Sequence, residues 1–298
     1  KEFRYLKHDW RNPSKQNNKI KVFGMRDQYK TDTAGIIDYT SNAWGVAYVH
    51  EDEKIKMGNS SGWYAGAVKN KFDFSDIGGS TEEQSIVKAG MFRSMPIGND
   101  HNNGLNWTVS AEGFMGNGET KRKFLVVDDI FEAKSDFHSY GASIKNEIRK
   151  NIRASQRISI SPYGSLKLEY GRFTGIKENT GEMRLEVKSN DYYSIKPEAG
   201  VEFKYSQPLA VRTKFVAKLG LAYENELGQV GDVDNKARVR YTTAGWFNIR
   251  GEKENKKGNF KTDFNTGIEN QIFGITLNGG YDAKGKNVRG GIGLRAIY

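Results

Sequence analysis

The chain has 298 residues, of which 37% are hydrophobic and 12% aromatic, with no cysteine and a formal net charge of +10. Without cysteine it can form neither a disulfide scaffold nor a cysteine-ligated metal site. Its Lys and Arg residues are scattered among apolar residues, with one tight cluster (KRK, residues 121–123), so we expect no nucleic-acid partner despite the basic charge.

Residues 1–18 differ from the rest of the chain. Within them, EFRYLKHDWR places Phe3, Leu6 and Trp10 on roughly one side of a helix, and Pro13 would end that helix. A disordered linker explains the segment equally well, so both interpretations stay open. No signal peptide is visible at Lys1, which leaves a cytosolic chain or the mature or C-terminal part of a longer one. We assign residues 19–298 to one β domain.

From residue 19 onward, apolar and polar residues alternate, as they do in strands that have one apolar face. No apolar run approaches the roughly 20 residues of a transmembrane helix. Many alternating segments exceed the five or six residues of an average soluble strand and reach the roughly 9–11 of a membrane-spanning one. We predict strands at 19–29, 36–50, 62–74, 85–96, 105–124, 137–150, 159–173, 185–205, 209–225, 260–271, 273–283 and 287–298.

These segments predict an all-β fold, a transmembrane antiparallel up-and-down β barrel of about 12 strands. Aromatic residues near the segment ends, such as Tyr205 and Phe273, are typical of the interfacial girdles of such barrels. The stretch 239–249 could add a thirteenth strand. We place it in a long loop, because the tight turns at 206–208 and 271–273 then lie on one side. The long connections at 125–136, 174–184 and 226–259 then lie on the other.

The polar face of the strands carries charged residues at regular intervals. A Lys or Arg facing lipid at the membrane midplane would cost about 2–4 kcal/mol, so we expect these side chains to face a wet lumen. Several of them could instead lie beyond the hydrocarbon zone and meet water. The predicted lumen-lining residues are Lys196, Glu198, Glu202, Lys204, Arg212, Lys214, Lys218 and Arg295.

Catalytic chemistry is not indicated. The four histidines, His8, His50, His101 and His138, do not have metal-ligand spacing, and no nucleophile with its base is visible. His101 beside Asp100 could form an acid–base pair, but GNDHNNG reads as a turn on the short-turn side of the barrel. We therefore expect no enzyme activity, no metal and no cofactor.

Several motifs occur in the order found in one known family. SPYGSLKLEYGRFTGIKENTG (161–181), then EAGVEFKY, LGLAYENELG (219–228) and GGYDAKGKNVRGGIGLRAIY (279–298) resemble the β-barrel translocator domain of type Va autotransporters, the type V secretion system. The resemblance covers roughly residues 19–298. Two features depart from the family: the chain ends on Tyr298 where the family usually has Phe, and Pro13 shortens any pore helix.

The resemblance implies a translocator in the outer membrane of a Gram-negative bacterium, which exports and anchors its own N-terminal passenger without a cofactor. It implies that the barrel-assembly machinery reads the apolar face of the last strand. The residues of that face are Ile292, Leu294, Ala296 and Tyr298. They could also simply face lipid. Further implied partners are periplasmic chaperones, outer-membrane lipid and lipopolysaccharide, and we expect a monomer. Asn17-Asn18 resembles the pair at which some autotransporters cut themselves, although chance explains it better in an Asn-rich chain.

Two other functions stay open at this point. A stand-alone porin or barrel enzyme would show the same strands. A soluble β-rich binding protein would show the alternation with a solvent-exposed polar face.

Overall fold

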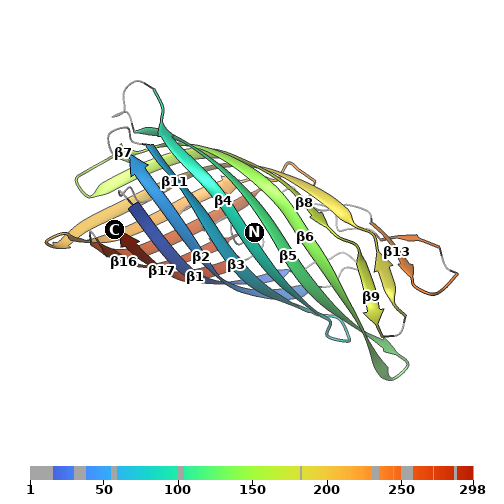
Figure 1. Ribbon diagram of the computed structural model, residues 1–298. Coiled ribbons are helices and arrows are strands. Elements are labelled where there is room, and N and C mark those ends of the chain that lie inside the picture. Colours follow the sequence, from blue (N-terminus) through green and yellow to red (C-terminus); the bar gives the residue numbers. More distant parts are fainter. Residues whose placement is uncertain are drawn as a thin grey trace.

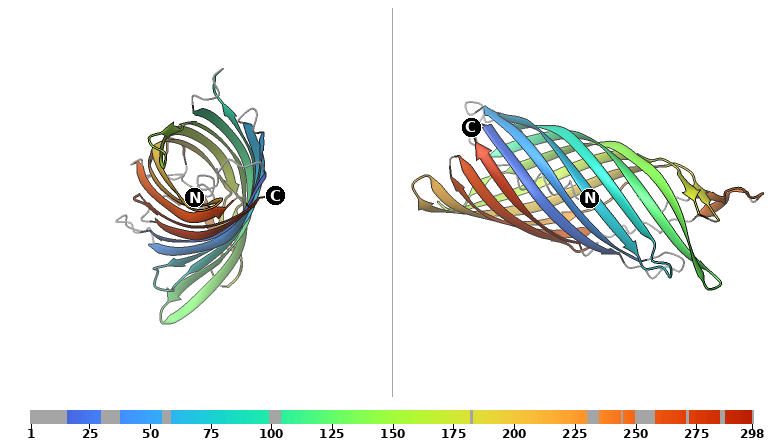
Figure 2. Two further views of the ribbon diagram at one scale, coloured as in Figure 1. Left: turned by 90° about the vertical axis from the view of Figure 1, so that its left-hand side faces the viewer. Right: turned by 60° about the horizontal axis from the view of Figure 1, so that its bottom comes forward.

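The computed structural model describes residues 16–29, 38–54, 59–98, 104–181, 183–229, 235–243, 245–249, 258–270, 272–284 and 287–297. They form one antiparallel sheet that closes on itself into a barrel (Figures 1 and 2). Twelve long strands build the wall. They are β1 (Gln16–Tyr29), β2 (Tyr39–Lys54), β3 (Asn59–Phe74), β4 (Thr81–Pro96), β5 (Leu105–Val126), β6 (Asp129–Lys150), β8 (Ile158–Phe173), β11 (Asn190–Ala210), β12 (Thr213–Glu224), β15 (Asn259–Asn270), β16 (Phe273–Asp282) and β17 (Asn287–Ile297).

Each long strand pairs with the next long strand along the chain, and β17 pairs with β1 to close the barrel. The closing register runs from Asn17 opposite Ile297 to Arg26 opposite Val288. The predicted up-and-down barrel of twelve strands is therefore confirmed. Among the residues that the structure describes, no helix is long and apolar enough to cross a membrane.

The two ends of the barrel differ. We call the end where β1 begins and β17 ends the near end, and the opposite one the far end. Tight connections at 211–212 and 271–272 lie at the near end, and the long connections 174–189 and 225–258 lie at the far end. For these four connections the sides are those that the sequence predicted, whereas the connection between β5 and β6, predicted to be long at the far end, has two residues. Figure 1 shows β9 and β13 at the end opposite the C-terminus.

Five short strands accompany the wall: β7 (Ile152–Arg153), β9 (Ile176–Thr180), β10 (Leu185–Val187), β13 (Asn235–Val239) and β14 (Phe247–Ile249). The last four continue the sheet beyond the far end, in the order β6, β9, β10, β13 and β14. The stretch 239–249 contributes only the end of β13 and β14, and β12 pairs directly with β15. The prediction that this stretch does not span is thus confirmed.

Three predicted boundaries are wrong. The turn at 206–208 lies instead at Val211 and Arg212, because a register shift after Pro208 lets β11 continue past a residue without an N–H donor. The predicted long loop 125–136 is a two-residue hairpin, since residues 125–130 are exposed on both faces and their sequence shows no alternation. The predicted strand 185–205 is divided into β10 and β11.

Large apolar side chains cover the outside of the wall. They are exposed on one strand after another, for example Val22, Trp44, Met91, Leu168 and Ile268. A surface of this size and composition is a lipid-facing one. Exposed Tyr205 and Phe273 lie at the near end, and exposed Tyr223 and Tyr281 at the far end. The aromatic residues therefore lie where the two membrane interfaces would be.

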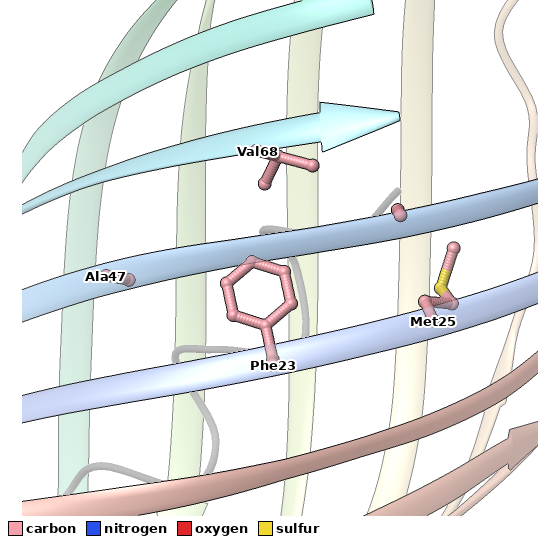
Figure 3. Packing of buried hydrophobic residues seen from close by; sticks show 5 residues of the cluster. Phe23, Met25, Ala47 and Val68 are labelled. Atoms are coloured by element: carbon pink, nitrogen blue, oxygen red, sulfur yellow. The ribbon is translucent and has the colours of Figure 1, made fainter. Parts of the chain in front are cut away.

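Aromatic rings on the inside lie over glycines of neighbouring strands. Figure 3 shows Phe23 of β1 reaching across β2 toward Val68. The ring covers Gly45, where an added Cβ would be 2.6 Å from Phe23 Cζ. Tyr192 of β11 covers Gly171 of β8 in the same way, with an added Cβ 2.3 Å from the ring. Glycine thus makes room for the rings that fill the interior beside the charged groups.

We predict that Gly171→Ala destabilises the barrel and that Gly164→Ala on the same strand does not. The Gly171 methyl would displace the Tyr192 ring, and overpacking of this kind costs about 1–3 kcal/mol. At Gly164 the nearest atom, Glu198 O, is 4.0 Å from an added Cβ. The measurement is the urea midpoint of the folded barrel in detergent. Equal midpoints for the two variants would contradict the packing explanation.

Candidate functional site

The inner face of the wall is polar and charged. Side chains that alternate with the outer apolar residues are buried, and many of them are ionisable. In a barrel this face surrounds the lumen, which is the candidate functional site. The buried charged residues of this face include Lys88, Glu112, Lys145, Glu147, Lys167, Glu198, Lys218, Glu224, Lys261, Glu269 and Arg295.

Glu112 of β5 is the centre of one inner network. Its side chain is 1% exposed. Its Oε1 accepts hydrogen bonds from Lys88 Nζ at 2.9 Å and Ser143 Oγ at 2.7 Å, and lies 3.5 Å from Lys167 Nζ. The Tyr64 hydroxyl donates to its other oxygen. One carboxylate therefore links β3, β4, β5, β6 and β8, and each buried charge in the network has an opposite partner.

Lys261 of β15 is the centre of a second network. Its Nζ lies 2.6 Å from Glu198 Oε2 and 3.3 Å from Glu224 Oε2. Glu198 and Glu224 are directly opposite in the register of β11 and β12. The Tyr163 hydroxyl of β8 donates to Glu198 Oε1 at 2.8 Å. The cation lies between two carboxylates that would otherwise repel each other, and it ties β15 to β11 across β12.

Arg289 of β17 forms a third group. Its Nη1 lies 2.5 Å from Asp263 Oδ1 on β15, and its Nη2 lies 3.2 Å from Asp282 Oδ1 on β16. With the two networks above, charged contacts inside the lumen join the wall from β3 to β17. The remaining sector, around β1 and β2, has the buried apolar residues of Figure 3.

Outside the wall, the strands beyond the far end carry their own ion pairs. Arg122 Nε and Nη2 donate to the two carboxylate oxygens of Glu178 at 2.7 and 2.9 Å. Arg238 joins β13 to β10 through Glu186, with Nε 2.8 Å from Oε2. The Arg238 guanidinium holds the pKa of Glu186 below its usual range. These pairs fix the short strands to one another above the lumen wall.

Most of the residues predicted to line the lumen lie on the inner face. Glu198, Lys218 and Arg295 are buried there. Lys196, Glu202 and Lys204, the other predicted residues on β11, are partly buried. Glu202 lies 3.5 Å from Arg149, and Lys196 lies 3.5 Å from Glu226.

Two predicted lumen residues lie at the near-end edge of the wall or beyond it. Arg212 is wrong as a wall residue, because it lies exposed in the near-end turn with φ 62°, outside both strands. Lys214 shares the inner face of β12 with Lys218, but it lies near the mouth, where its side chain is 46% exposed and its Nζ is 3.8 Å from Glu269. The Arg212 prediction is wrong because the sequence places the β11–β12 turn too early.

Sequence reasoning did not single out several central residues. Glu112, Lys88 and Lys261 occupy the inner parity of segments that were predicted as strands. The same alternation that selected Lys196 and Glu198 would have selected them. Which charges meet across the lumen depends on register, and register is not readable from a single strand.

The last strand presents one apolar face outward. Ile292 is 55% exposed and Leu294 46% exposed, and Ala296 lies on the same face. Arg295 points to the opposite, inner face and is buried. Tyr298 lies outside the described residues.

The histidines that the structure describes have polar neighbours. His138 Nδ1 lies 2.7 Å from Asn117 Oδ1. His50 Nδ1 lies 2.6 Å from Asn18 Oδ1. No group of three His, Cys, Asp or Glu residues in the described part of the chain could hold a metal ion. His8 and His101 lie outside the described residues.

Asn18, a member of the pair considered for self-cleavage, faces away from the lumen. It shares a face of β1 with the exposed Ile20. Its Oδ1 accepts a hydrogen bond from the Tyr48 hydroxyl at 2.5 Å, besides the contact with His50. The Asn18 side chain is therefore on the face opposite to that of the buried acidic residues, whereas Asn17 is opposite Glu51 in the register of β1 and β2.

Comparisons with known proteins agree with this architecture. A family model described as "Autotransporter beta-domain" matches residues 20–295. The chain is similar to the solved translocator domain of the autotransporter NalP from Neisseria meningitidis, with a TM-score of 0.76 and 10% identity, covering 100% of this chain and 94% of that one. A comparison with curated proteins gives no match.

Two further solved structures are similar. The β domain of the Bordetella autotransporter BrkA gives a TM-score of 0.63 at 13% identity, covering 96% of this chain and 100% of that one. The transport unit of the autotransporter AIDA-I from Escherichia coli gives 0.62 at 14% identity, covering 96% and 92%. At these sequence identities, the similarity to the solved structures shows a shared fold and nothing more.

The Lys261 network generates a prediction about stability. Replacing Lys261 by Met leaves Glu198 and Glu224 facing each other inside the wall, and removing one partner of a buried ion pair costs about 3–5 kcal/mol. We expect a lower urea midpoint for the folded barrel in detergent. Adding Glu224→Gln to the variant should recover a large part of the loss, because it removes the repulsion. A double variant no more stable than the single one would contradict this account.

Proposed function

Because the chain belongs to the autotransporter β-domain family, we propose that its barrel carries an N-terminal passenger from the periplasm to the cell surface and then anchors it. The chain is an outer-membrane translocator domain of a Gram-negative bacterium, and the family implies a passenger ahead of it in the sequence.

The position of the two ends of the wall supports a direction of export. β1 begins and β17 ends at the near end, where the connections 211–212 and 271–272 are tight. Short turns of such barrels face the periplasm and long loops face outward. A passenger that precedes Gln16 therefore joins the barrel at its periplasmic mouth. To reach the surface it has to cross the height of the barrel, through the lumen or beside it.

The charged inner wall suits a hydrated passage. The networks around Glu112 and Lys261 pair their charges within the wall, so they stabilise the strands while leaving the inner face polar. A polypeptide segment in the lumen would keep its backbone groups hydrogen-bonded to water or to these side chains, which lipid would not allow.

We propose that the chain needs no catalytic residue, cofactor or nucleotide for this function. Folding of the barrel, helped by the barrel-assembly machinery, supplies the driving force. Periplasmic chaperones hold the strands before insertion, and outer-membrane lipid and lipopolysaccharide then cover the apolar outer surface. We propose a monomer that binds no nucleic acid. The residues ahead of β1, most of the predicted linker 1–18, join passenger to barrel.

The last strand has a further proposed role. Ile292, Leu294, Ala296 and Tyr298 form the apolar face that the assembly machinery reads. The outward exposure of Ile292 and Leu294 supports this, because the face is accessible before lipid covers it. The same exposure suits a purely lipid-facing role, so the experiment has to separate the two.

Surface display tests the export function. An epitope-tagged reporter is fused ahead of Lys1, behind a signal peptide, in a Gram-negative host. We expect protease added to intact cells to remove the tag, and the barrel to migrate faster on gels before boiling than after. A tag that stays protected beside a heat-modifiable barrel would overturn the translocator function in favour of a porin-like or enzymatic barrel. Soluble protein without a heat shift would overturn the membrane function itself.

A matched pair of substitutions tests the recognition role. Leu294 of β17 and Ile275 of β16 are directly opposite in register and about equally exposed to lipid. We expect Leu294→Asn to reduce the amount of assembled barrel in cells at least five-fold more than Ile275→Asn. Refolding of the two purified variants into detergent should be equal. Equal losses in cells would mean that Leu294 is only a lipid-facing residue.

A further inference from the structure

Four cations gather on the inner wall near the periplasmic mouth. Lys204 of β11 is directly opposite Lys218 of β12, and Lys19 of β1 is directly opposite Arg295 of β17. We call these four residues the basic cluster. Like charges placed directly across two strands destabilise a sheet, so two such pairs in one sector require an explanation.

Elsewhere on the same wall, a pair of like charges directly opposite each other is neutralised by an opposite charge. Glu198 and Glu224 are also directly opposite, and Lys261 lies between them within 3.3 Å of both. In the described part of the basic cluster, no single carboxylate lies within ion-pair distance of both members of a pair, although Glu51 and Glu269 act electrostatically on Lys19. Glu269, at 3.5 Å from Arg295, is the one carboxylate within ion-pair distance of it in the described part of the chain. For Lys19, Lys204 and Lys218 the described residues provide no hydrogen bond or ion pair.

Two of these cations are buried, and Lys19 and Lys204 are partly buried. Lys218 and Arg295 are each only 8% exposed. Together with Lys19 they line a cavity of about 20 Å³, whose other polar walls include Asn265, Glu269 and Thr276. That space exceeds the roughly 10–15 Å³ that one water-sized group needs. The Arg295 Nε is buried without a hydrogen-bond partner.

A buried cation without a partner is costly, and an anion is what would offset that cost. We propose that the basic cluster is a binding site for a carboxylate, which places one oxygen in the cavity between Lys19, Lys218 and Arg295. Because the cavity admits a single oxygen-sized group, the rest of the ligand lies in the lumen. The site lies close to the mouth at which a polypeptide would enter, because Lys19 and Arg295 are near the ends of β1 and β17.

Carboxylates have two sources here. One is a small free acid. The other, which rests on the proposed export function, is an Asp or Glu side chain of the polypeptide in transit, which the site would hold briefly as it enters. Both sources present the same carboxylate group, so two separate experiments, one on binding and one on transit, distinguish them.

The binding arm uses the purified chain, folded in non-ionic detergent, titrated with sodium acetate in a calorimeter. Sodium chloride at equal ionic strength is the comparison. We expect saturable heat with acetate, and at least ten-fold weaker binding in Lys218→Gln. Lys214→Gln is the matched control, because it removes the same charge from the same strand near the mouth but outside the cavity. It should bind within two-fold of the unaltered chain.

Three results would overturn the site: no saturable heat with acetate, an equal response to chloride, or equal weakening in both variants. Urea unfolding serves as the control for misfolding of the Lys218→Gln variant. In acetate-free buffer, Lys218→Gln should unfold at the same or a higher urea concentration than the unaltered chain, because it relieves the repulsion with Lys204. A lower midpoint would mean that Lys218 is a structural residue, contrary to the proposal.

The transit arm uses surface display with two reporter linkers, one rich in Glu and one with Gln at the same positions. If the passing polypeptide is the ligand, Lys218→Gln slows display of the Glu linker at least three-fold relative to the Gln linker. If the ligand is a free acid, the two linkers respond equally while the binding arm still succeeds. Failure of both linkers even with the unaltered barrel would count against the export function and leave the binding result standing.

Discussion

The structure depends on one constraint: inside lipid, a backbone N–H or C=O group has no water to bind. A sheet that crosses the hydrocarbon region therefore cannot have a free edge. The pairing of β17 with β1 meets this requirement, since the edges of the first and last strands hydrogen-bond to each other. Three features follow from that closure: the outer apolar belt, the wet lumen, and the position of the start of β1 and the end of β17 at the same end of the barrel.

Closure also places the alternating side chains of each strand in two different environments, the lumen and the lipid. The odd residues of β17 meet the lumen and the even ones meet lipid, so Arg295 and Leu294 are neighbours in sequence but lie on opposite sides of the wall. Charges on the inner side are mostly neutralised within the wall, as at Glu112 and Lys261. The basic cluster is the sector where this compensation is weakest.

Much of this architecture could be predicted because period-two alternation reports directly on strand faces. Strand number, sidedness and the loop assignment of 239–249 follow from it. The two-residue hairpin at Val127 and Asp128 could not, because both of its faces are exposed and the alternation stops. The partners of Lys261 could not either, since they lie on strands whose register a single sequence leaves open. Arg212 was misplaced because a bulge near Pro208 delays the turn.

The seam between β1 and β17 has a consequence for timing. Its two strands come from opposite ends of the chain, so this contact has the largest sequence separation in the molecule and closes the longest loop. Among the strands of the barrel, β17 is the last to be synthesised. The barrel consequently cannot close before β17 has been made, and any segment ahead of β1 has been synthesised long before then. If that segment crosses the barrel as proposed, it has to stay unfolded for the whole interval before β17 pairs with β1.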